Sequence, residues 1–333
     1  MRGGDEEGAA GRGPSRRAVI VAVGGLAAAA FLPGGAKAET RLPSTVRIYV
    51  PYGRGSVVAV TCDVLSAALS AALSRRIEID IPPLPDRMQR SLTALADQGR
   101  GELRLLASDT LTHVMYDAAE ASRKPNAAAS LDILVPIATL TVGYSTALFV
   151  SADSPVRDWA AFAEMARGRQ LTVASSNPGS VHLRFLELAL GQGLRDVLAP
   201  GRERVFETVL EGRASAGLIN TPSLASFMRA NPGRLRALVT FGGERNPALD
   251  VPTLREVTGR RSYASTNSVG LFAPAGTAPD VVAQMHAALV AAAADKRVVQ
   301  AAQAIGLPLQ ISDAADLALT VARDREVVVE SGL

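Results

Sequence analysis

The chain has 333 residues, of which 48% are hydrophobic, 20% are charged and 4% are aromatic, and its formal net charge at pH 7 is +3. This length is enough for two domains or lobes that each bury a core. The near balance of 35 Lys+Arg against 32 Asp+Glu, without a run of like charges, argues against a nucleic-acid-binding protein. The single cysteine, Cys62, excludes an intramolecular disulfide and a multi-cysteine zinc site, and its apolar helical surroundings predict a buried thiol.

Residues 1–38 have the pattern of an export signal. Ser15-Arg16-Arg17 precedes an apolar stretch from Ala18 to Leu32, which is shorter than the roughly 20 residues that a bilayer span requires. The A-x-A pattern Ala36-Lys37-Ala38 follows and predicts cleavage after Ala38. The paired arginines favour a twin-arginine signal, with an ordinary secretory signal as the alternative. We therefore expect an exported protein whose mature part is periplasmic and has no membrane span.

From residue 45 onward, short strands alternate with amphipathic helices. Alternating hydrophobic residues predict strands at 46–50 and 77–81, and further short hydrophobic segments predict strands at 103–107, 171–174, 217–219 and 237–240. Patterns with a period near 3.6 predict helices at 57–73, 183–190 and 224–228. Gly191 is expected to end the second of these helices. The alternation predicts parallel sheets in α/β layers.

One internal similarity bears on the architecture. Residues 148–150, followed by a turn, Pro155 and a helical pattern, match residues 271–273, followed by a turn, Pro279 and a helical pattern. Two such units could be the crossing strands of a two-lobed protein. The alternative is that strand–turn–proline–helix is a common arrangement in α/β proteins.

No catalytic or metal-binding signature is present among the patterns G-x-S-x-G, H-E-x-x-H and G-x-x-x-x-G-K-[ST]. His113, His182 and His286 are far apart in sequence, and none has a second histidine or an acid at metal-ligand spacing. His286 lies in an apolar helical pattern and is expected to be structural, whereas His182 follows a Gly-Ser turn at a helix start and is a candidate pocket residue. We therefore predict no enzyme, no cofactor and no metal, and an exported enzyme is the least favoured reading.

Two turns could bind an anion through their backbone. Gly53-Arg54-Gly55-Ser56 and Asn177-Pro178-Gly179-Ser180 each end a strand and open a helix. Helix N-termini present unpaired N–H groups and a partial positive charge, and ligands of open α/β sheets bind at the carboxyl ends of strands. The alternative is that Gly and Ser serve only to cap the helix.

The segments Val46–Tyr52, Ser175–Leu183, Arg234–Glu256 and Gly270–Val282 occur in an order that resembles a known family. That family is the periplasmic solute receptors of tripartite tricarboxylate transporters, the TctC or Bug family. The resemblance covers nearly the whole mature chain and is most specific in its C-terminal half.

The resemblance implies an α/β fold of type II periplasmic-binding-protein architecture, with a ligand cleft between two lobes joined by crossing strands. It implies that residues 44–143 and 252–333 form lobe 1 and that residues 144–251 form lobe 2. It also implies a small carboxylated solute, bound largely through backbone amides, and membrane permease subunits as partners. A ligand sensor or scaffold that presents to an extracytoplasmic signalling domain is the alternative function.

The chain departs from the family in its second strand–helix turn. Residues Ile81–Arg87 contain three prolines and no glycine, so this turn has few free amide donors. We therefore consider that the guanidinium of Arg54 or Arg87 holds the carboxylate instead, because its planar fork matches two oxygens. The alternative for both arginines is an ordinary surface position.

The predicted ligand-binding residues follow strands or open helices in both lobes. They are Tyr52, Gly53, Arg54, Gly55, Ser56, Ser108, Asp109, Thr110, Ser176, Asn177, Gly179, Ser180, His182, Asn220 and Thr221.

Overall fold

The computed structural model describes residues 42–84, 86–97, 101–124, 129–176 and 180–332. The predicted export signal and two predicted site residues, Asn177 and Gly179, lie outside the described residues. Residues Glu39–Leu333 form one compact unit.

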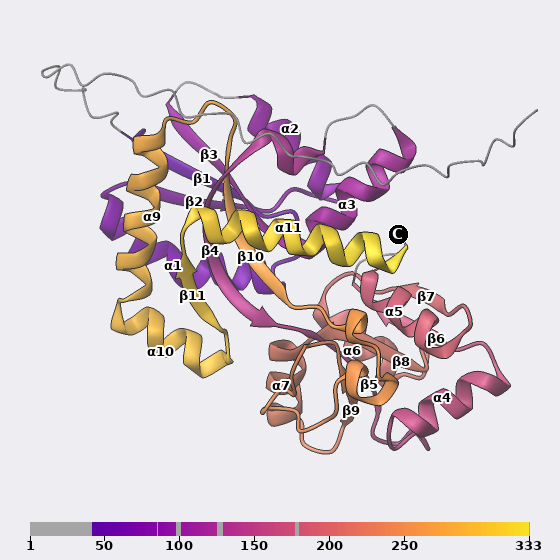
Figure 1. Cartoon of the computed structure of the whole chain (residues 1–333). Coiled ribbons are helices and arrows are strands. Elements are labelled where there is room, and N and C mark those ends of the chain that lie inside the picture. Colours follow the sequence, from indigo (N-terminus) through magenta and orange to yellow (C-terminus); the bar gives the residue numbers. More distant parts are fainter. Residues whose placement is uncertain (1–41, 85, 98–100, 125–128, 177–179, 333) are drawn as a thin grey trace, which may run out of the picture. The chain divides into compact units, whose positions relative to one another are not determined.

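Figure 1 shows the helices and strands in chain order. The strands are β1 (Thr45–Tyr49), β2 (Arg76–Asp80), β3 (Glu102–Asp109), β4 (Leu134–Tyr144), β5 (Thr146–Ser151), β6 (Thr172–Ser175), β7 (Arg195–Leu198), β8 (Ala216–Asn220), β9 (Leu235–Thr240), β10 (Asn267–Pro274) and β11 (Leu309–Ser312). The α-helices are α1 (Val57–Leu73), α2 (Arg87–Ala96), α3 (Thr110–Arg123), α4 (Trp159–Gly168), α5 (Val181–Leu190), α6 (Arg202–Leu210), α7 (Thr221–Ala230), α8 (Leu254–Thr258), α9 (Pro279–Ala293), α10 (Lys296–Ile305) and α11 (Ala314–Ser331). Two short 3₁₀ helices are η1 (Ser130–Ile133) and η2 (Arg261–Tyr263).

Two separate sheets organise the chain. Sheet A has six strands in the order β11-β4-β10-β3-β1-β2, and sheet B has five in the order β7-β6-β8-β5-β9. In sheet A, β1 pairs in parallel with β2 and β3, while β10 runs antiparallel to β3 and β4. In sheet B, β6 pairs in parallel with β7 and β8, while β5 runs antiparallel to β8 and β9. The predicted parallel pairing is therefore confirmed for β1–β3 and β6–β8. Two strands of sheet A, β10 and β11, run opposite to the others, and in sheet B one strand, β5, does so.

Local sequence explains the first strand–helix unit. Val46 and Ile48 alternate along β1 and are buried, as the period-two pattern predicts. α1 begins at Val57 because the Ser56 hydroxyl accepts a hydrogen bond from the Ala59 N–H at 3.1 Å. Cys62 is buried in the apolar face of this helix, as predicted. The helix predicted before Gly191 is also confirmed, because Gly191 closes α5 in the left-handed conformation.

The chain crosses between the sheets at two places. The first crossing is the single residue Ser145 between β4 and β5, and its carbonyl accepts a hydrogen bond from the Thr221 N–H at 2.7 Å. The second is the segment 241–266 between β9 and β10. The two segments with similar sequences, 148–150 and 271–273, lie in β5 and β10, which are the first strands that the chain enters after each crossing.

The second crossing stays attached to sheet B for much of its length. The Thr240 N–H donates to the Pro252 carbonyl at 3.0 Å, and Thr240 forms an isolated parallel bridge with Thr253. Pro252 and Thr253 therefore pair with the end of β9, although the division inferred from the sequence places them with lobe 1.

The hydrophobic core is continuous between the sheets. One buried cluster combines Leu106 and Phe272 of sheet A with Leu148 and Val173 of sheet B, and includes Leu317 of α11. Figure 1 shows α11 running along sheet A toward α5, and the helix contacts α3, β4 and α5. Helix α11 therefore packs on both sides of the crossings. Among the described helices, none combines the length and apolar composition that crossing a membrane requires.

Candidate functional site

The first strand–helix turn of sheet A is a tight turn at the carboxyl end of β1. The Ser56 N–H donates to the Gly53 carbonyl at 2.9 Å, and the Ser56 hydroxyl caps α1. Arg54 is exposed, so its guanidinium is accessible from solvent. This turn places Gly53 to Ser56 at the helix start, as the sequence predicts.

Tyr52 joins this turn to the end of β3. Its hydroxyl lies 3.0 Å from the Ser108 hydroxyl and 3.5 Å from the Asp109 carbonyl. Burial and the nearby Asp109 raise the pKa of Tyr52 well above its usual value, so the phenol remains protonated. Three predicted residues are therefore brought together in one hydrogen-bonded group.

Asp109 connects the same group to both crossings. Its side chain caps α3 by accepting from the Thr112 N–H at 2.8 Å. It also accepts from the Tyr144 hydroxyl and, at 3.0 and 3.2 Å, from the Asn267 side-chain amide. Tyr144 is the last residue before the first crossing and Asn267 the first residue after the second. The sequence predicted Asp109 but not these two partners, because their meeting depends on how β3, β4 and β10 are ordered in sheet A.

The second turn of sheet A presents an arginine to the first. The Arg87 Nε donates to the Pro82 carbonyl at 2.8 Å, and a Cβ built on Gly53 would lie 3.7 Å from Arg87 Nη1. Asp86, at the start of α2, has a φ of +63° and makes no side-chain cap. The Arg87 guanidinium therefore lies beside the first turn, where the sequence argument places a carboxylate.

The predicted residues of sheet B mostly cap helices. The Ser180 hydroxyl accepts from the Leu183 N–H at 3.2 Å and opens α5, and the Asn220 side chain accepts from the Ser223 N–H at 2.9 Å and opens α7. Thr221 is buried and bonds to the first crossing through its N–H. Ser176 is half-buried at the end of β6.

His182 is buried rather than open to a cleft. Its Nε2 lies 3.0 Å from the Ser265 hydroxyl, and its ring packs edge-on against Phe241 with ring centroids 4.9 Å apart. Burial lowers the pKa of His182 to about 3, so the imidazole is neutral. His182 therefore contacts both ends of the second crossing, at Phe241 and Ser265. The ligand role of His182 stays a prediction.

The first turn of sheet A contacts helix α6, which follows strand β7 of sheet B. A Cβ built on Gly55 would lie 3.3 Å from Oε2 of Glu203 and 3.6 Å from Nε of Arg202. Both residues are in the first turn of α6, so the start of this helix faces the start of α1. Sequence analysis missed Arg202 and Glu203, although Gly201 directly before them is a helix-start signal of the kind used for the other turns.

A buried acid on α11 was also missed. Asp324 is 5% exposed, and its Oδ2 has no hydrogen-bond partner. Burial and the nearby Asp109 raise the pKa of Asp324 to about 7. The spacing of Leu317, Val321, Asp324 and Val328 places this acid on the buried face of the helix, and that pattern was the available signal.

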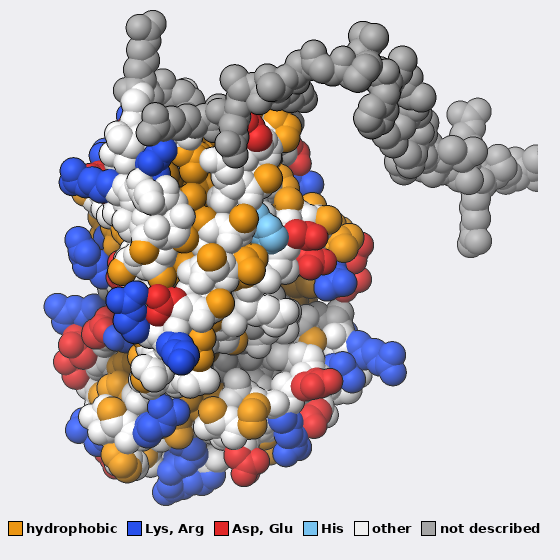
Figure 2. All heavy atoms as spheres, turned by 90° about the vertical axis from the view of Figure 1, so that its left-hand side faces the viewer, with side chains coloured by type: hydrophobic (Ala, Val, Ile, Leu, Met, Phe, Trp, Pro, Cys, Tyr) orange, Lys and Arg blue, Asp and Glu red, His pale blue; other side chains and the backbone are white. Residues whose placement is uncertain are grey.

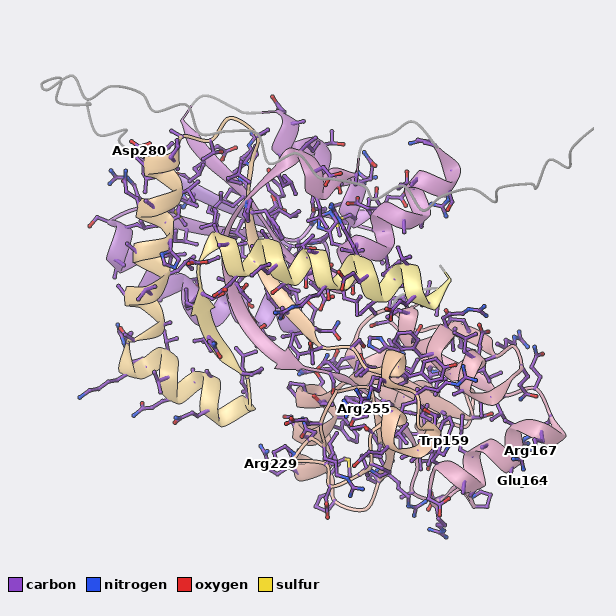
Figure 3. All side chains as sticks on the ribbon, in the orientation of Figure 1. Trp159, Glu164, Arg167, Arg229, Arg255 and Asp280 are labelled. Atoms are coloured by element: carbon purple, nitrogen blue, oxygen red, sulfur yellow. The ribbon has the colours of Figure 1, made fainter. Side chains whose placement is uncertain are left out.

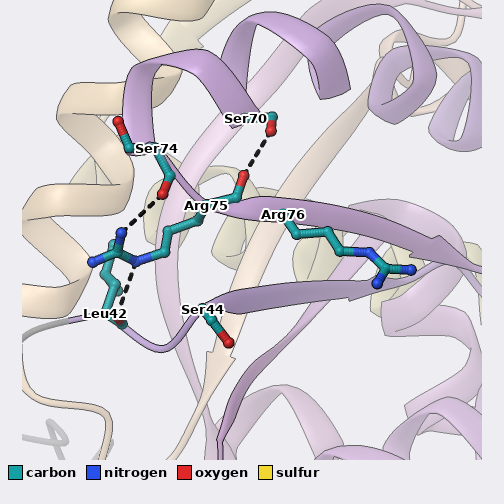
Figure 4. Close-up of a pocket in the computed structure, with 6 residues that line it drawn as sticks. All are labelled: Leu42, Ser44, Ser70, Ser74, Arg75 and Arg76. Atoms are coloured by element: carbon teal, nitrogen blue, oxygen red, sulfur yellow. Dashed lines mark hydrogen bonds between the residues drawn. The ribbon is translucent and has the colours of Figure 1, made fainter.

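Two surface recesses lie away from these turns. One, of about 670 Å³, is lined by Leu42, three serines, Arg75 and Arg76, and Figure 4 shows Arg75 donating to the carbonyls of Leu42 and Ser74. The other, of about 550 Å³, lies between α2 and α3 and includes Tyr116. Neither is lined by a predicted ligand-binding residue.

The charged surface shows no concentrated site. On the face drawn in Figure 2, acidic side chains lie among the basic ones. Figure 3 shows Glu164 and Arg167 together on α4, whereas Arg229 lies apart from them on α7. Within the described residues, no group of three or more His, Cys, Asp and Glu side chains could hold a metal ion.

The chain is similar to known receptors over most of its length. The family model of the tripartite tricarboxylate transporter family receptor matches residues 110–328. A Cupriavidus necator protein, described as "UPF0065 protein in gbd 5'region", is 27% identical over 292 residues, which are 81% of this chain and 83% of that protein.

Solved structures show the same fold. MatC from Rhodopseudomonas palustris with bound malate has a TM-score of 0.72 and 24% identity, covering 85% of this chain and 98% of that one. R. palustris Rpa4515 with adipate has a TM-score of 0.73 and 19% identity, covering 87% and 98%. The predicted two-lobed α/β fold of periplasmic binding proteins is therefore confirmed, and the matched family is one of receptors rather than enzymes.

Proposed function

We propose that this chain, which belongs to the tripartite tricarboxylate transporter receptor family, captures a small carboxylated solute between its two sheets and delivers it to the transporter's membrane subunits. We also propose that it works in the periplasm, after export through the twin-arginine-like signal of residues 1–38 and cleavage after Ala38. The division into lobe 1 (44–143 and 252–333) and lobe 2 (144–251) remains part of this proposal.

The contact between the first turn and α6 carries the proposal. Gly55 of the first turn lies against Glu203 and Arg202 at the start of α6, so the helix starts of α1 and α6 face one another. Helix N-termini attract anions, and a solute held between two lobes would stabilise their closure. The family match supports a receptor, and the MatC and Rpa4515 structures hold malate and adipate.

Arg87 is the residue we assign to the carboxylate. The prolines of the second turn remove amide donors, and the Arg87 guanidinium reaches the edge of the first turn near Gly53. Its Nε donates to the Pro82 carbonyl, which restricts the guanidinium plane, and its Nη1 lies beside Gly53. A guanidinium held in this way can bind two carboxylate oxygens.

Titration calorimetry of residues 39–333 with malate and adipate tests both parts of the proposal. We expect Arg87→Ala to weaken binding of the preferred dicarboxylate by about tenfold or more, because a charge-assisted hydrogen bond is lost. Arg229→Ala is the matched control, since Arg229 is an exposed arginine on α7 (Figure 3) and should leave the affinity unchanged. If Arg87→Ala binds as the wild type does, the role of Arg87 is wrong. If wild-type protein binds no carboxylate, the solute class is wrong.

The transporter partner calls for a separate test. Residues 39–333 loaded with solute should bind detergent-solubilised permease subunits of such a transporter more tightly than the empty protein does, because only the closed form presents both lobes in the docking geometry. Equal binding of loaded and empty protein would contradict delivery to a permease.

A further inference from the structure

The Thr110 hydroxyl lies between the start of β10 and helix α11. The Thr110 hydroxyl lies 3.3 Å from the Ser268 carbonyl, and Ser268 is the second residue of β10, directly after Asn267. The same hydroxyl is within hydrogen-bonding reach of the Asp324 carboxyl. Thr110 therefore links the start of α3, the second crossing and α11.

A hydroxyl has only one proton to donate. When Asp324 is neutral, its O–H can donate to the Thr110 oxygen while Thr110 donates to the Ser268 carbonyl. When Asp324 is ionised, it can only accept, and the Thr110 proton satisfies either the carboxylate or the Ser268 carbonyl, but not both. Ionisation therefore competes directly with the bond that holds the start of β10 to α3.

The surroundings of Asp324 favour its neutral form. Asp324 is 5% exposed, its Oδ2 has no partner, and the Asp109 carboxylate lies nearby. The Thr110 hydroxyl, which can donate to the carboxylate, and the exposed Arg323 on the same helix both oppose this effect, but burial outweighs them and the pKa stays raised. From β4, the Tyr144 hydroxyl faces the group but donates to Asp109.

Helix α3 also packs on α11, and its buried His113 and Asp117 both hydrogen-bond to Ser130.

The other elements packed on α11 are α5 and η2. Helix α5 contributes His182, which is neutral, together with the ion pair Arg184–Glu187. The 3₁₀ helix η2 contributes Arg261 and Tyr263. Within the described residues, no hydrogen bond or ion pair joins a basic group of α5 or η2 to Asp324.

We propose that Asp324 is a proton switch at the end of the second crossing: its neutral form holds the start of β10 on α3 through Thr110, and its ionised form, repelled by Asp109, loosens this attachment. Tyr144 and Asn267 both bind Asp109, so this loosening affects the residues where the chain enters and leaves the crossings. If the chain is the solute receptor proposed above, solute affinity falls as the pH rises through neutrality.

Hydrogen exchange without any solute tests the switch. Protection factors, corrected for intrinsic exchange, are measured at pH 6 and pH 8 for peptides spanning residues 141–146 and 265–269 of the unit Glu39–Leu333. We expect protection to fall about threefold or more at pH 8, since one linked proton allows at most about a tenfold change per pH unit. Asp324→Asn should keep the pH 6 protection at both values, because its amide can still donate to Thr110.

Two further variants complete the test. Glu326→Gln, an exposed acid on the same helix, should behave as the wild type does. Thr110→Val removes the relay and should lower protection of 265–269 at both pH values. A wild-type protein without the pH effect, or an Asp324→Asn variant that keeps it, would overturn the switch. Because no solute is present, either result leaves the receptor proposal to be judged by calorimetry.

Discussion

Asp109 and Asp324 are two buried acids near the crossings, and their surroundings differ sharply. The Asp109 side chain accepts hydrogen bonds from the Thr112 N–H, the Tyr144 hydroxyl and the Asn267 amide. The Asp324 Oδ2 has no partner, and the Asp109 carboxylate is its nearby charge. Both side chains are about equally buried, at 6% and 5% exposed.

Because the two carboxyls are about equally buried, the difference between them lies in the number of hydrogen-bond donors that surround each one. A carboxylate surrounded by donors can fasten several elements together, because each donor is itself satisfied in the bond. A buried carboxyl with one unpartnered oxygen and only a shared hydroxyl as donor is costly when ionised and keeps its proton to a higher pH. In this protein the first acid fastens the crossings, and the second makes one of those fastenings dependent on pH.

The largest expected effect comes from removing the acceptor at the crossings. Asp109→Asn should lower the free energy of unfolding by about 3–4 kcal/mol, because its amide would face the Tyr144 and Asn267 donors with donors of its own. Urea denaturation of residues 39–333 measures this. A loss below about 1 kcal/mol would show that the hydrogen bonds to Asp109 do not fasten the crossings.

Asp324→Asn should instead raise the free energy of unfolding at alkaline pH. The pKa of Asp324 is about 7 in the folded protein against 3.8 for the ordinary group, so the wild type is most stable below pH 4 with respect to this group and loses that stability as the pH rises toward 7. At pH 8 the variant should be more stable by about 2–3 kcal/mol, within the limit of ~4 kcal/mol that such a shift allows.

Comparing the unfolding free energies of the wild type and Asp324→Asn at pH 5 and pH 8 isolates this group, because the two buried histidines contribute equally to both proteins. A stability difference that does not grow with pH would contradict the proposed protonation of Asp324.

Tyr144→Phe sharpens the comparison by removing one donor from Asp109 while keeping the ring. Asp109 retains Asn267 and Thr112, so we expect a smaller loss of about 1.5–2 kcal/mol, as for one hydrogen bond to a charged group. Thermal unfolding of the variant beside Asp109→Asn measures it. A loss as large as that of Asp109→Asn would mean that the phenol alone accounts for the cluster.

The smallest effect concerns a cap with a single hydrogen bond. Ser56 accepts only from the Ala59 N–H, so Ser56→Ala should cost about 1 kcal/mol. Ser66→Ala, at an exposed hydroxyl that bonds only to the Asp63 carbonyl within the same helix, is a matched control and should change little. Chemical denaturation separates the two. Equal losses of unfolding free energy in the two variants would show that the Ser56 cap does not stabilise α1 more than an ordinary surface hydroxyl does.

Local sequence patterns were sufficient to predict many of the strands and helices and the residues at which helices begin. The alternation of Val46 and Ile48 predicts β1, and the serine before Val57 marks the start of α1. Such signals come from residues within one or two turns of each other. The fold followed from the succession of these units together with the family resemblance.

Contacts between distant segments were not predictable in this way. Asn267 meets Asp109 because β10 enters sheet A antiparallel beside β3, and Gly55 meets Glu203 because the first turn lies against side chains at the start of α6. His182 was predicted from its position at a helix start, yet its side chain turns toward Ser265 and Phe241. A sequence position indicates where a helix begins, but the packing decides which way the side chain points.

Thermal unfolding of residues 39–333 against paired solutes tests the central claim, that the chain is a receptor for small carboxylates. Adipate and malate would be compared with their diamides, together with mono- and tricarboxylates. A ligand at about 1,000 times its Kd stabilises by roughly 4 kcal/mol, which for a protein of this size corresponds to several degrees. The account predicts such a shift with at least one carboxylate and none with its diamide. Equal shifts with acid and diamide, or no shift with any carboxylate, would contradict it.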